Sequence, residues 1–192
     1  MSLPTIGQAR MLADEFELLI ERESPGSVAI VGCAGGNGLE RIAPGKVRRV
    51  VAVDINPRYV EETGRRHAGR LAGLELICAD VQSAELRFEP VDLVYAALIF
   101  EYVDAAWTLA TLQRNCKAGG TLAILLQLHD RGQQAVSPSP YRSLSSLAPV
   151  LRLVSPPELA SKAAAAGFVA AESRTIAPDS GKRFQLQTFR RA

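Results

Sequence analysis

The spacing of apolar residues changes along the chain between helical and strand-like periods, which is typical of a layered α/β domain. A helical stripe of apolar residues predicts an amphipathic helix over residues 5–22. Short apolar runs at 28–31 and 50–53 predict buried parallel strands. The first of these strands leads directly into a glycine-rich loop, and the second ends at Asp54.

The same reasoning places the remaining elements. Further strands are predicted over residues 74–79, 91–97, 121–128, 169–176 and 183–189, and further helices from Pro57 to about Gly69, from near Asp104 to the Lys117–Gly120 turn, and over 156–166. Asn56 is expected to cap its helix, and Ser155 with Glu158 forms a predicted capping box. The last two strands are joined by a turn-forming Pro-Asp-Ser-Gly cluster, which predicts an antiparallel hairpin at the sheet edge.

These elements predict a doubly wound, mostly parallel seven-stranded sheet that closes with an antiparallel hairpin. Residues 1–192 are expected to form a single domain, in which residues 1–25 carry the N-terminal helix. Residues 130–154 combine prolines and serines with many apolar side chains, so we expect a segment that covers the active site.

Composition narrows the class of protein. Of the 192 residues, 47% are hydrophobic and 22% are charged, and the net charge is only +2. The basic residues are scattered among acids, so no basic stripe predicts a nucleic-acid partner. No apolar stretch reaches the roughly 18 residues of a spanning helix, and no signal peptide is recognised, so we expect a cytoplasmic protein without membrane contact.

The cysteines and histidines suggest neither a disulfide framework nor a metal site. The three cysteines are widely spaced, and Cys78 and Cys116 are predicted to be small core residues. No acid-rich cluster suggests a divalent metal. His67 lies in a predicted helix among arginines, where we expect a solvated surface group.

The glycine-rich loop is the first candidate for a binding site. Gly32, Gly35, Gly36 and Gly38 follow the first strand, and a helix after them would direct backbone amides and its positive end toward a ligand. A tight strand-to-helix turn would look the same. Asp54, at the end of the second strand, is placed to accept ribose hydroxyls, although it could instead cap the turn that follows.

Five segments in order resemble the class I S-adenosylmethionine-dependent methyltransferases, and the resemblance covers nearly the whole chain. Residues 28–38 (VAIVGCAGGNG) look like that family's first motif, and Asp54 matches its ribose-binding acid. Residues 78–81 (CADV) resemble the third motif, 90–95 (PVDLVY) the fourth strand, and 117–121 (KAGGT) the turn before the fifth. The family has a Rossmann-like fold, which agrees with the predicted elements.

The resemblance implies S-adenosylmethionine as the cofactor and S-adenosylhomocysteine as its product. No metal is expected, because the sequence has no acid-rich cluster. The residues that it assigns to the cofactor are Gly32, Cys33, Ala34, Gly36, Gly38, Asp54, Ile55, Asp80, Val81 and Ala97. Two positions depart from the family pattern. Ile30 stands where an acid is usual, and Ala34 stands where a second glycine is usual, so a wider loop is expected there.

Two other interpretations remain open. A nicotinamide-dependent oxidoreductase would have glycines at the positions of Ala34 and Asn37, and the sequence lacks them. The departures at Ile30 and Ala34 also allow a binding protein of methyltransferase fold that has lost its activity.

The acceptor is predicted to be a small molecule, since no nucleic-acid amine motif follows the fourth strand. Methyl transfer from a sulfonium depends mainly on alignment and exclusion of water, and it needs a base only for protonated nucleophiles. Glu101 and His129 are the candidate catalytic residues, because they follow the fourth and fifth strands. Tyr102, Asp130, Tyr141 and Arg142 are the candidate substrate-binding residues.

Overall fold

The computed structural model describes residues 4–128, 154–178 and 182–192. Its strands are β1 (Ser27–Val31), β2 (Arg49–Asp54), β3 (Leu74–Cys78), β4 (Val91–Ala97), β5 (Cys116–Leu128), β6 (Phe168–Ile176) and β7 (Arg183–Arg191). Its helices are α1 (Pro4–Glu23), α2 (Pro57–His67), α3 (Ala105–Asn115) and α5 (Pro156–Ala165), with a short 3-10 helix η1 (Leu39–Arg41). The predicted elements therefore form close to their expected positions.

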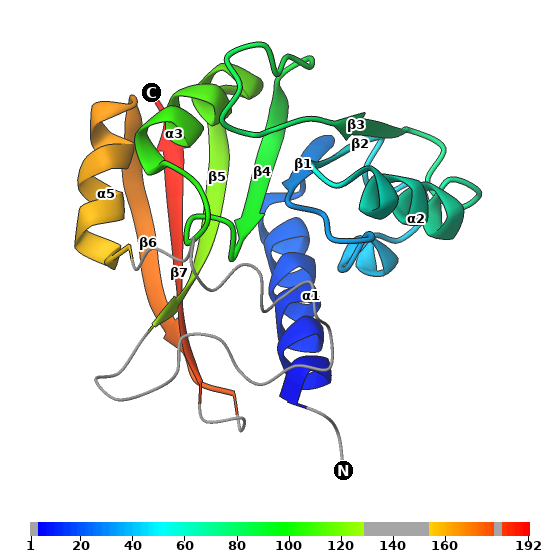
Figure 1. The fold of residues 1–192 in the computed structure, drawn as a ribbon, viewed down its shortest axis with the longest axis horizontal. Coiled ribbons are helices and arrows are strands. Elements are labelled where there is room, and N and C mark those ends of the chain that lie inside the picture. Colours follow the sequence, from blue (N-terminus) through cyan, green and yellow to red (C-terminus); the bar gives the residue numbers. More distant parts are fainter. Residues whose placement is uncertain (1–3, 129–153, 179–181) are drawn as a thin grey trace.

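The strands form one seven-stranded sheet in the order β3-β2-β1-β4-β5-β7-β6. The first five strands are parallel to one another, and β7 is antiparallel to both β5 and β6. The predicted doubly wound sheet with a C-terminal hairpin is therefore confirmed, with β6 as the edge strand and β7 between β5 and β6 (Figure 1).

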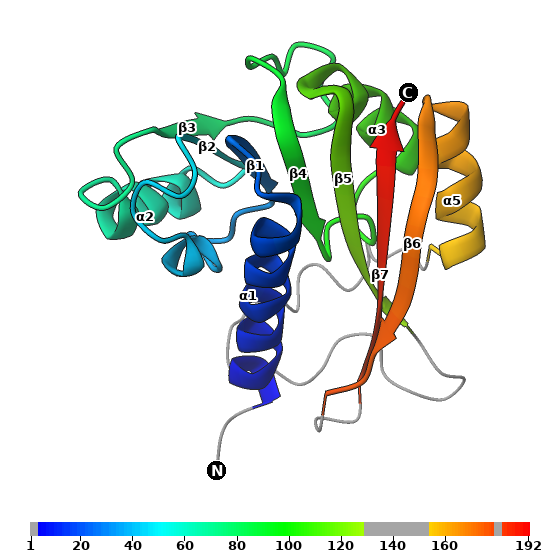
Figure 2. The ribbon, with the colours of Figure 1, turned by 180° about the vertical axis from the view of Figure 1, so that it is seen from behind.

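Two apolar cores lie on opposite faces of this sheet. On one face, Leu109 and Leu112 of α3 and Leu159 of α5 are fully buried with the strand residues. On the other face, Phe16 and Leu19 of α1 are buried against β1, β4 and β5 (Figure 2). Because central strands are covered on both faces, their sequences are continuously apolar rather than alternating.

Local caps explain where the helices begin. The side chain of Asn56 accepts from the amide of Arg58 at 3.1 Å, and Pro57 occupies the first turn of α2, as predicted. Ser155 Oγ accepts from the amide of Glu158 at 3.4 Å, which is one half of the predicted capping box. Each cap satisfies an amide that the helix itself leaves without a partner.

Three predictions from local pattern were wrong. Residues 117–120 do not precede the fifth strand as a separate turn, because β5 already begins at Cys116 and bulges between the pairs Val91–Cys116 and Leu93–Thr121. Cys78 is exposed, because β3 is an edge strand with no neighbour beyond it, whereas Cys116 is buried as predicted. The glycine loop leads not into a helix but into the three-residue η1.

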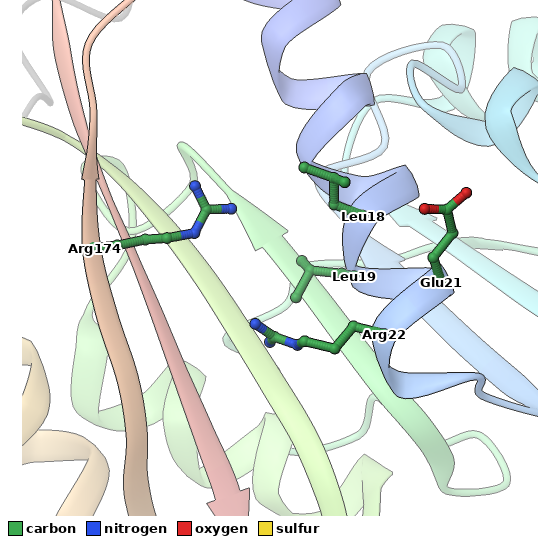
Figure 3. Close-up of a pocket in the computed structure, with 5 residues that line it drawn as sticks. All are labelled: Leu18, Leu19, Glu21, Arg22 and Arg174. Atoms are coloured by element: carbon green, nitrogen blue, oxygen red, sulfur yellow. The ribbon is translucent and has the colours of Figure 1, made fainter.

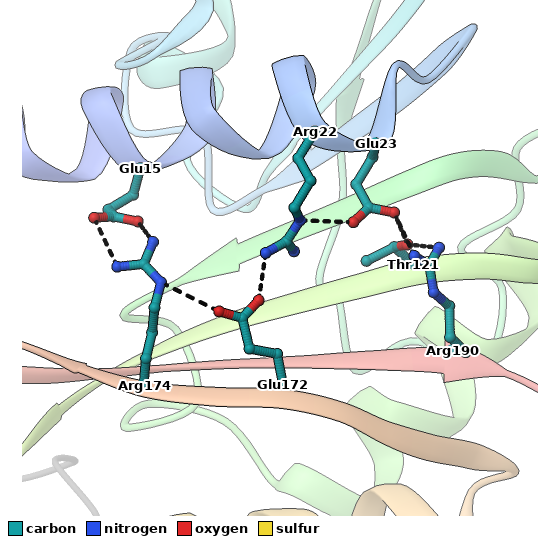
Figure 4. Close-up of polar contacts among 7 residues, drawn as sticks. All are labelled: Glu15, Arg22, Glu23, Thr121, Glu172, Arg174 and Arg190. Atoms are coloured by element: carbon teal, nitrogen blue, oxygen red, sulfur yellow. Dashed lines mark hydrogen bonds and ion pairs between the residues drawn. The ribbon is translucent and has the colours of Figure 1, made fainter.

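A polar network fastens α1 to the C-terminal hairpin (Figure 4). Glu15 pairs with Arg174 of β6, and Glu172 contacts both Arg174 and Arg22 of α1. Glu23 accepts from Thr121 at 2.9 Å and pairs with Arg190 of β7 at 2.7 Å. The network holds the first and last elements of the chain in register across the same face of the sheet.

Candidate functional site

The candidate site lies where the carboxyl ends of β1, β2 and β4 meet. The connection after β1 runs toward β2 on one side, and β4 lies on the other side of β1. The direction in which the chain winds therefore reverses between β1 and β4. Open α/β sheets bind their ligands in the crevice at such a point.

The first turn of the glycine loop is fixed to β2 and leaves its outer backbone exposed. The amides of Gly32 and Cys33 both donate to the carbonyl of Val53, at 2.9 and 3.1 Å. Gly32 and Ala34 are exposed, whereas the Cys33 thiol is buried and contacts Thr63 Oγ1 at 3.5 Å. The backbone of Gly32 and Ala34 is thus the part of the loop that a ligand can reach.

Gly32 must be glycine for two reasons. Its φ is +74°, a conformation that other residues rarely adopt. A Cβ atom there would also lie 2.3 Å from Cγ2 of Ile99, which belongs to the segment after β4. The loop and the segment after β4 are therefore closely packed at this position.

Gly36 and Gly38 face the protein rather than the crevice. Both are buried, and a Cβ atom on Gly36 would lie 2.7 Å from the ring of His67. A Cβ atom on Gly38 would lie 3.2 Å from the ring of Phe16. These glycines allow α1 and α2 to approach the loop, and their predicted contact with a cofactor stays a prediction.

His67 is buried, so the prediction of a solvated histidine was wrong. Only 3% of its surface is exposed, because the face of α2 that carries Thr63 and His67 packs beneath the loop. Neither ring nitrogen has a hydrogen-bond partner among the described residues. Burial, followed by the nearby charges of Arg66 and Arg70, lowers the pKa of His67.

The loop keeps a left-handed backbone at Ala34, where the family usually has glycine. Its φ is +43°, which costs a residue with a Cβ atom about 1 kcal/mol or more. The amide of Ala34 donates to Oδ2 of Asp54 at 3.0 Å, which links the loop to the end of β2. Ile30, the other departure, is buried in the apolar core.

Asp54 is the carboxylate that joins the loop to the turn after β2. It is 8% exposed, and its Oδ1 accepts from the amide of Asn56 at 2.9 Å while Oδ2 accepts from Ala34. The turn-capping role and a ligand role are compatible, since a carboxylate has about four acceptor positions. Ile55, the next residue, is 66% exposed.

The segment after β3 is fastened to the start of α3. Oδ1 of Asp80 accepts from the amide of Gln82 at 2.9 Å, and Oε1 of Gln82 accepts from the amide of Asp104 at 2.8 Å. Asp80 and Val81 are half-buried. Their predicted role in holding an adenine ring stays a prediction.

Glu101 follows β4 and is the buried acid of this region. It is 4% exposed, and its Oε1 accepts from the amide of Gln127 at 2.9 Å. Its Oε2 is buried and has no hydrogen-bond partner among the described residues. Burial raises the pKa of Glu101, and burial together with the nearby Glu101 raises the pKa of the half-buried Tyr102.

Ala97, at the end of β4, is half-buried beside this segment. The remaining predicted site residues, His129, Asp130, Tyr141 and Arg142, lie outside the described residues, as do residues 130–153 of the predicted cover segment. The roles assigned to them stay predictions.

Sequence reasoning missed one cation and two amides near this edge. Lys182 donates to Oε1 of Gln8 at 3.3 Å and to Oε1 of Gln127 at 3.4 Å. No local motif marks these residues, since they come from α1, from β5 and from the position just before β7. The predicted antiparallel hairpin was the only available signal, because it brings the start of the last strand to the carboxyl end of β5.

Two surface grooves lie away from this crevice. One, of about 430 Å³, lies between α1 and β6 and is lined by Leu18, Leu19, Glu21, Arg22 and Arg174 (Figure 3). The other, of about 520 Å³, is lined by the ends of α1 and β7 and the bulge of β5. None of the predicted cofactor residues lines either groove.

The described parts of the chain contain no helix long and apolar enough to cross a membrane. Within those same ranges, no three His, Cys, Asp or Glu side chains are grouped as they would be around a metal ion.

Comparison with known proteins agrees with this arrangement. Residues 30–124, about half of the chain, match a family model described as a methyltransferase domain. No curated protein sequence matches the chain.

Solved structures share the fold at low sequence identity. The N-methyltransferase NodS from Bradyrhizobium japonicum WM9, in complex with S-adenosylhomocysteine, is 16% identical, with 93% of this chain and 86% of that chain covered and a TM-score of 0.69. The geranyl diphosphate C-methyltransferase from Streptomyces coelicolor A3(2) is 14% identical, with coverage of 95% and 81% and a TM-score of 0.73. The (4+2)-cyclase SpnF is 14% identical, with coverage of 93% and 80% and a TM-score of 0.74.

The matched methyltransferase domain contains the glycine loop, Asp54 and Glu101, and the sheet order is that of the shared fold. The nicotinamide interpretation has no such support. Residues 30–124 of this chain belong to the methyltransferase-domain family, and the chain has the Rossmann-like methyltransferase fold.

Proposed function

We propose that this protein transfers the methyl group of S-adenosylmethionine to a small-molecule acceptor. The observation that carries the proposal is the link between the exposed glycine loop and Asp54, made by the hydrogen bond from Ala34 at 3.0 Å. It sets a carboxylate and the exposed backbone of Gly32 and Ala34 side by side at the point where the winding of the sheet reverses.

The residues at this crevice fit the cofactor. Asp54 keeps acceptor positions for two ribose hydroxyls after it has bound two amides. The exposed side chain of Ile55 offers an apolar surface to one face of an adenine ring, and Asp80 would accept from its amino group. The exposed backbone of Gly32 and Ala34 lets the methionine part approach closely.

When bound, S-adenosylmethionine supplies an electrophilic methyl group on a sulfonium. The acceptor's lone pair must align with the methyl–sulfur bond, so the chain contributes mainly by orienting the acceptor and excluding water. Glu101 Oε2 is the buried atom that would take a proton from an N–H or O–H acceptor. A pKa raised by burial makes Glu101 a stronger base once it is ionised.

A small acceptor is supported by the kind of protein that shares the fold. The geranyl diphosphate C-methyltransferase is described in complex with geranyl diphosphate, S-adenosylhomocysteine and Mg²⁺. For this chain we propose only that the acceptor is a small molecule, and we propose no particular compound.

The proposal is tested first by calorimetric titration with S-adenosylmethionine and S-adenosylhomocysteine. We expect both to bind, and we expect labelled methyl groups to pass from the cofactor to a small molecule in a metabolite extract. Well-folded protein that does not bind either compound at millimolar concentration would refute the proposal.

A second candidate is a protein of this family that binds the cofactor without transferring its methyl group. The strained Ala34 and the apolar Ile30 favour it, since the family usually has a glycine and an acid at these positions. The shared fold of the (4+2)-cyclase SpnF also shows that the architecture serves other reactions. Cofactor binding without product from any extract would favour this candidate.

A further inference from the structure

Lys182 lies at the carboxyl edge of the sheet, beside the end of β5. β7 runs antiparallel to β5, and Arg183 pairs with Leu128, so the residue before β7 reaches the end of β5. The contacts of Lys182 Nζ with Gln127 and Gln8 fix its head group there. This is the edge from which an acceptor must approach, and the start of α1 borders it (Figure 1).

The ammonium group is partly desolvated but has no carboxylate partner among the described residues. Both of its hydrogen-bond partners are neutral amide oxygens. Burial lowers the pKa of Lys182. Several other cations of the fold are paired with acids, for example Lys117 with Asp92 at 2.8 Å and Arg174 with Glu15.

The same residue, Gln127, also holds Glu101. Its side chain accepts from Lys182, and its backbone amide donates to Oε1 of Glu101. The free Oε2 of Glu101 and the uncompensated cation of Lys182 are therefore placed around one residue at the end of β5. An acid and a cation on either side of Gln127 suit a ligand that has a proton to give and a negative charge.

We infer that the methyl acceptor carries an anionic group, a carboxylate or a phosphate, that binds Lys182 while its nucleophilic N–H or O–H faces Glu101. The inference rests on the proposed function, and it names the chemical class of the acceptor. A partly buried cation gains most from an anion, because the charge-assisted hydrogen bond replaces the hydration that burial removed.

The test uses acetate and inorganic phosphate as probes on the full chain saturated with S-adenosylhomocysteine. Thermal stability is measured against each anion, with chloride as the reference at the same ionic strength. We expect stabilisation by acetate if the group is a carboxylate and by phosphate if it is a phosphate. Lys182→Gln should lower the affinity for the anion about tenfold or more, which is the change expected when one charge-assisted hydrogen bond is lost.

Two further variants separate a binding role from a structural one. Lys182→Arg keeps the charge and should retain anion binding, and Lys46→Gln removes an exposed charge that lines the second groove and should change nothing. Equal stabilisation of wild type and Lys182→Gln, or no stabilisation by either anion, would overturn the inference. A tenfold loss of S-adenosylhomocysteine affinity in Lys182→Gln would also overturn it, because Lys182 would then hold the cofactor.

The acceptor itself gives an independent readout. Labelled S-adenosylmethionine is incubated with matched pairs of compounds, each carboxylic acid with its primary amide and each phosphate monoester with its parent alcohol. Methylation of the anionic members supports the inference, and methylation confined to the neutral members contradicts it. If the cofactor does not bind at all, the proposed function fails rather than this inference.

Discussion

Replacing Glu101 by glutamine should make the protein more stable and less active at the same time. The substitution keeps an oxygen for the amide of Gln127, which donates to Oε1 at 2.9 Å, and it removes the ionisable group. Oε2 of the natural acid is buried without a partner among the described residues. The acid therefore costs stability whenever it is charged.

The sign of the pH dependence follows from the raised pKa of Glu101. A group whose pKa is higher in the folded protein contributes stability that is present below its ordinary pKa of 4.5 and lost as pH rises through the folded value. The variant should therefore match wild type near pH 4.5 and exceed it in alkaline buffer. The amide group of glutamine takes the place of Oε2, so the expected gain in unfolding free energy is the cost of the buried charge alone, about 1 to 3 kcal/mol.

Urea denaturation between mildly acidic and alkaline pH measures this gain, and each kcal/mol should raise the melting temperature by about 2 to 4 °C. The cofactor affinity of the variant should stay within a few-fold of the wild-type value. The rate of methyl transfer to an N–H or O–H acceptor should fall about 100-fold. Glu61→Gln, on the exposed surface of α2, serves as the control. A variant that is less stable than wild type at every pH would show that Glu101 is a structural anchor, and unchanged turnover would remove it from catalysis.

Three further predictions concern the cofactor crevice and the loop beneath it. Asp54→Ala should weaken S-adenosylhomocysteine binding by about 1 to 3 kcal/mol in calorimetry, because hydrogen bonds to a charged acceptor are lost, and unchanged affinity would exclude Asp54 from the site. Ala34→Gly should raise the unfolding free energy by up to about 1 kcal/mol. Glycine removes the strain of the left-handed backbone at φ +43°, and this gain should exceed the stability lost because glycine makes the unfolded chain more flexible. A less stable variant would show that the backbone at Ala34 is not strained. Because the pKa of His67 is lowered in the folded protein, stability should fall as pH drops below its ordinary value of 6.5 toward the folded one, and melting curves of His67→Gln should lack this step.

Most of the fold could be predicted from local sequence. The apolar run at 91–97 matches β4 to the residue, and the caps at Asn56 and Ser155 begin their helices as expected. These features depend on the spacing of apolar residues and on hydrogen bonds between residues close together in the chain, so they can be predicted from the order of residues alone. The order of the motifs also predicted the methyltransferase family, which the matched domain supports.

Other features depend on which elements become neighbours. The sequence alone could not tell that β3 lies at an edge and exposes Cys78, or that α2 buries His67 beneath Gly36. Nor could it predict that the glycine loop would lead into only three residues of 3-10 helix.

The glycine loop, Asp54 and Glu101 were recognisable from the sequence because each lies at or shortly after the end of a predicted strand. Their hydrogen bonds, and the position of Lys182 beside Gln127, were decided only by the tertiary structure. The reason is physical: the register between β5 and β7 joins residues 55 positions apart, and burial then determines which of their charges lack a partner.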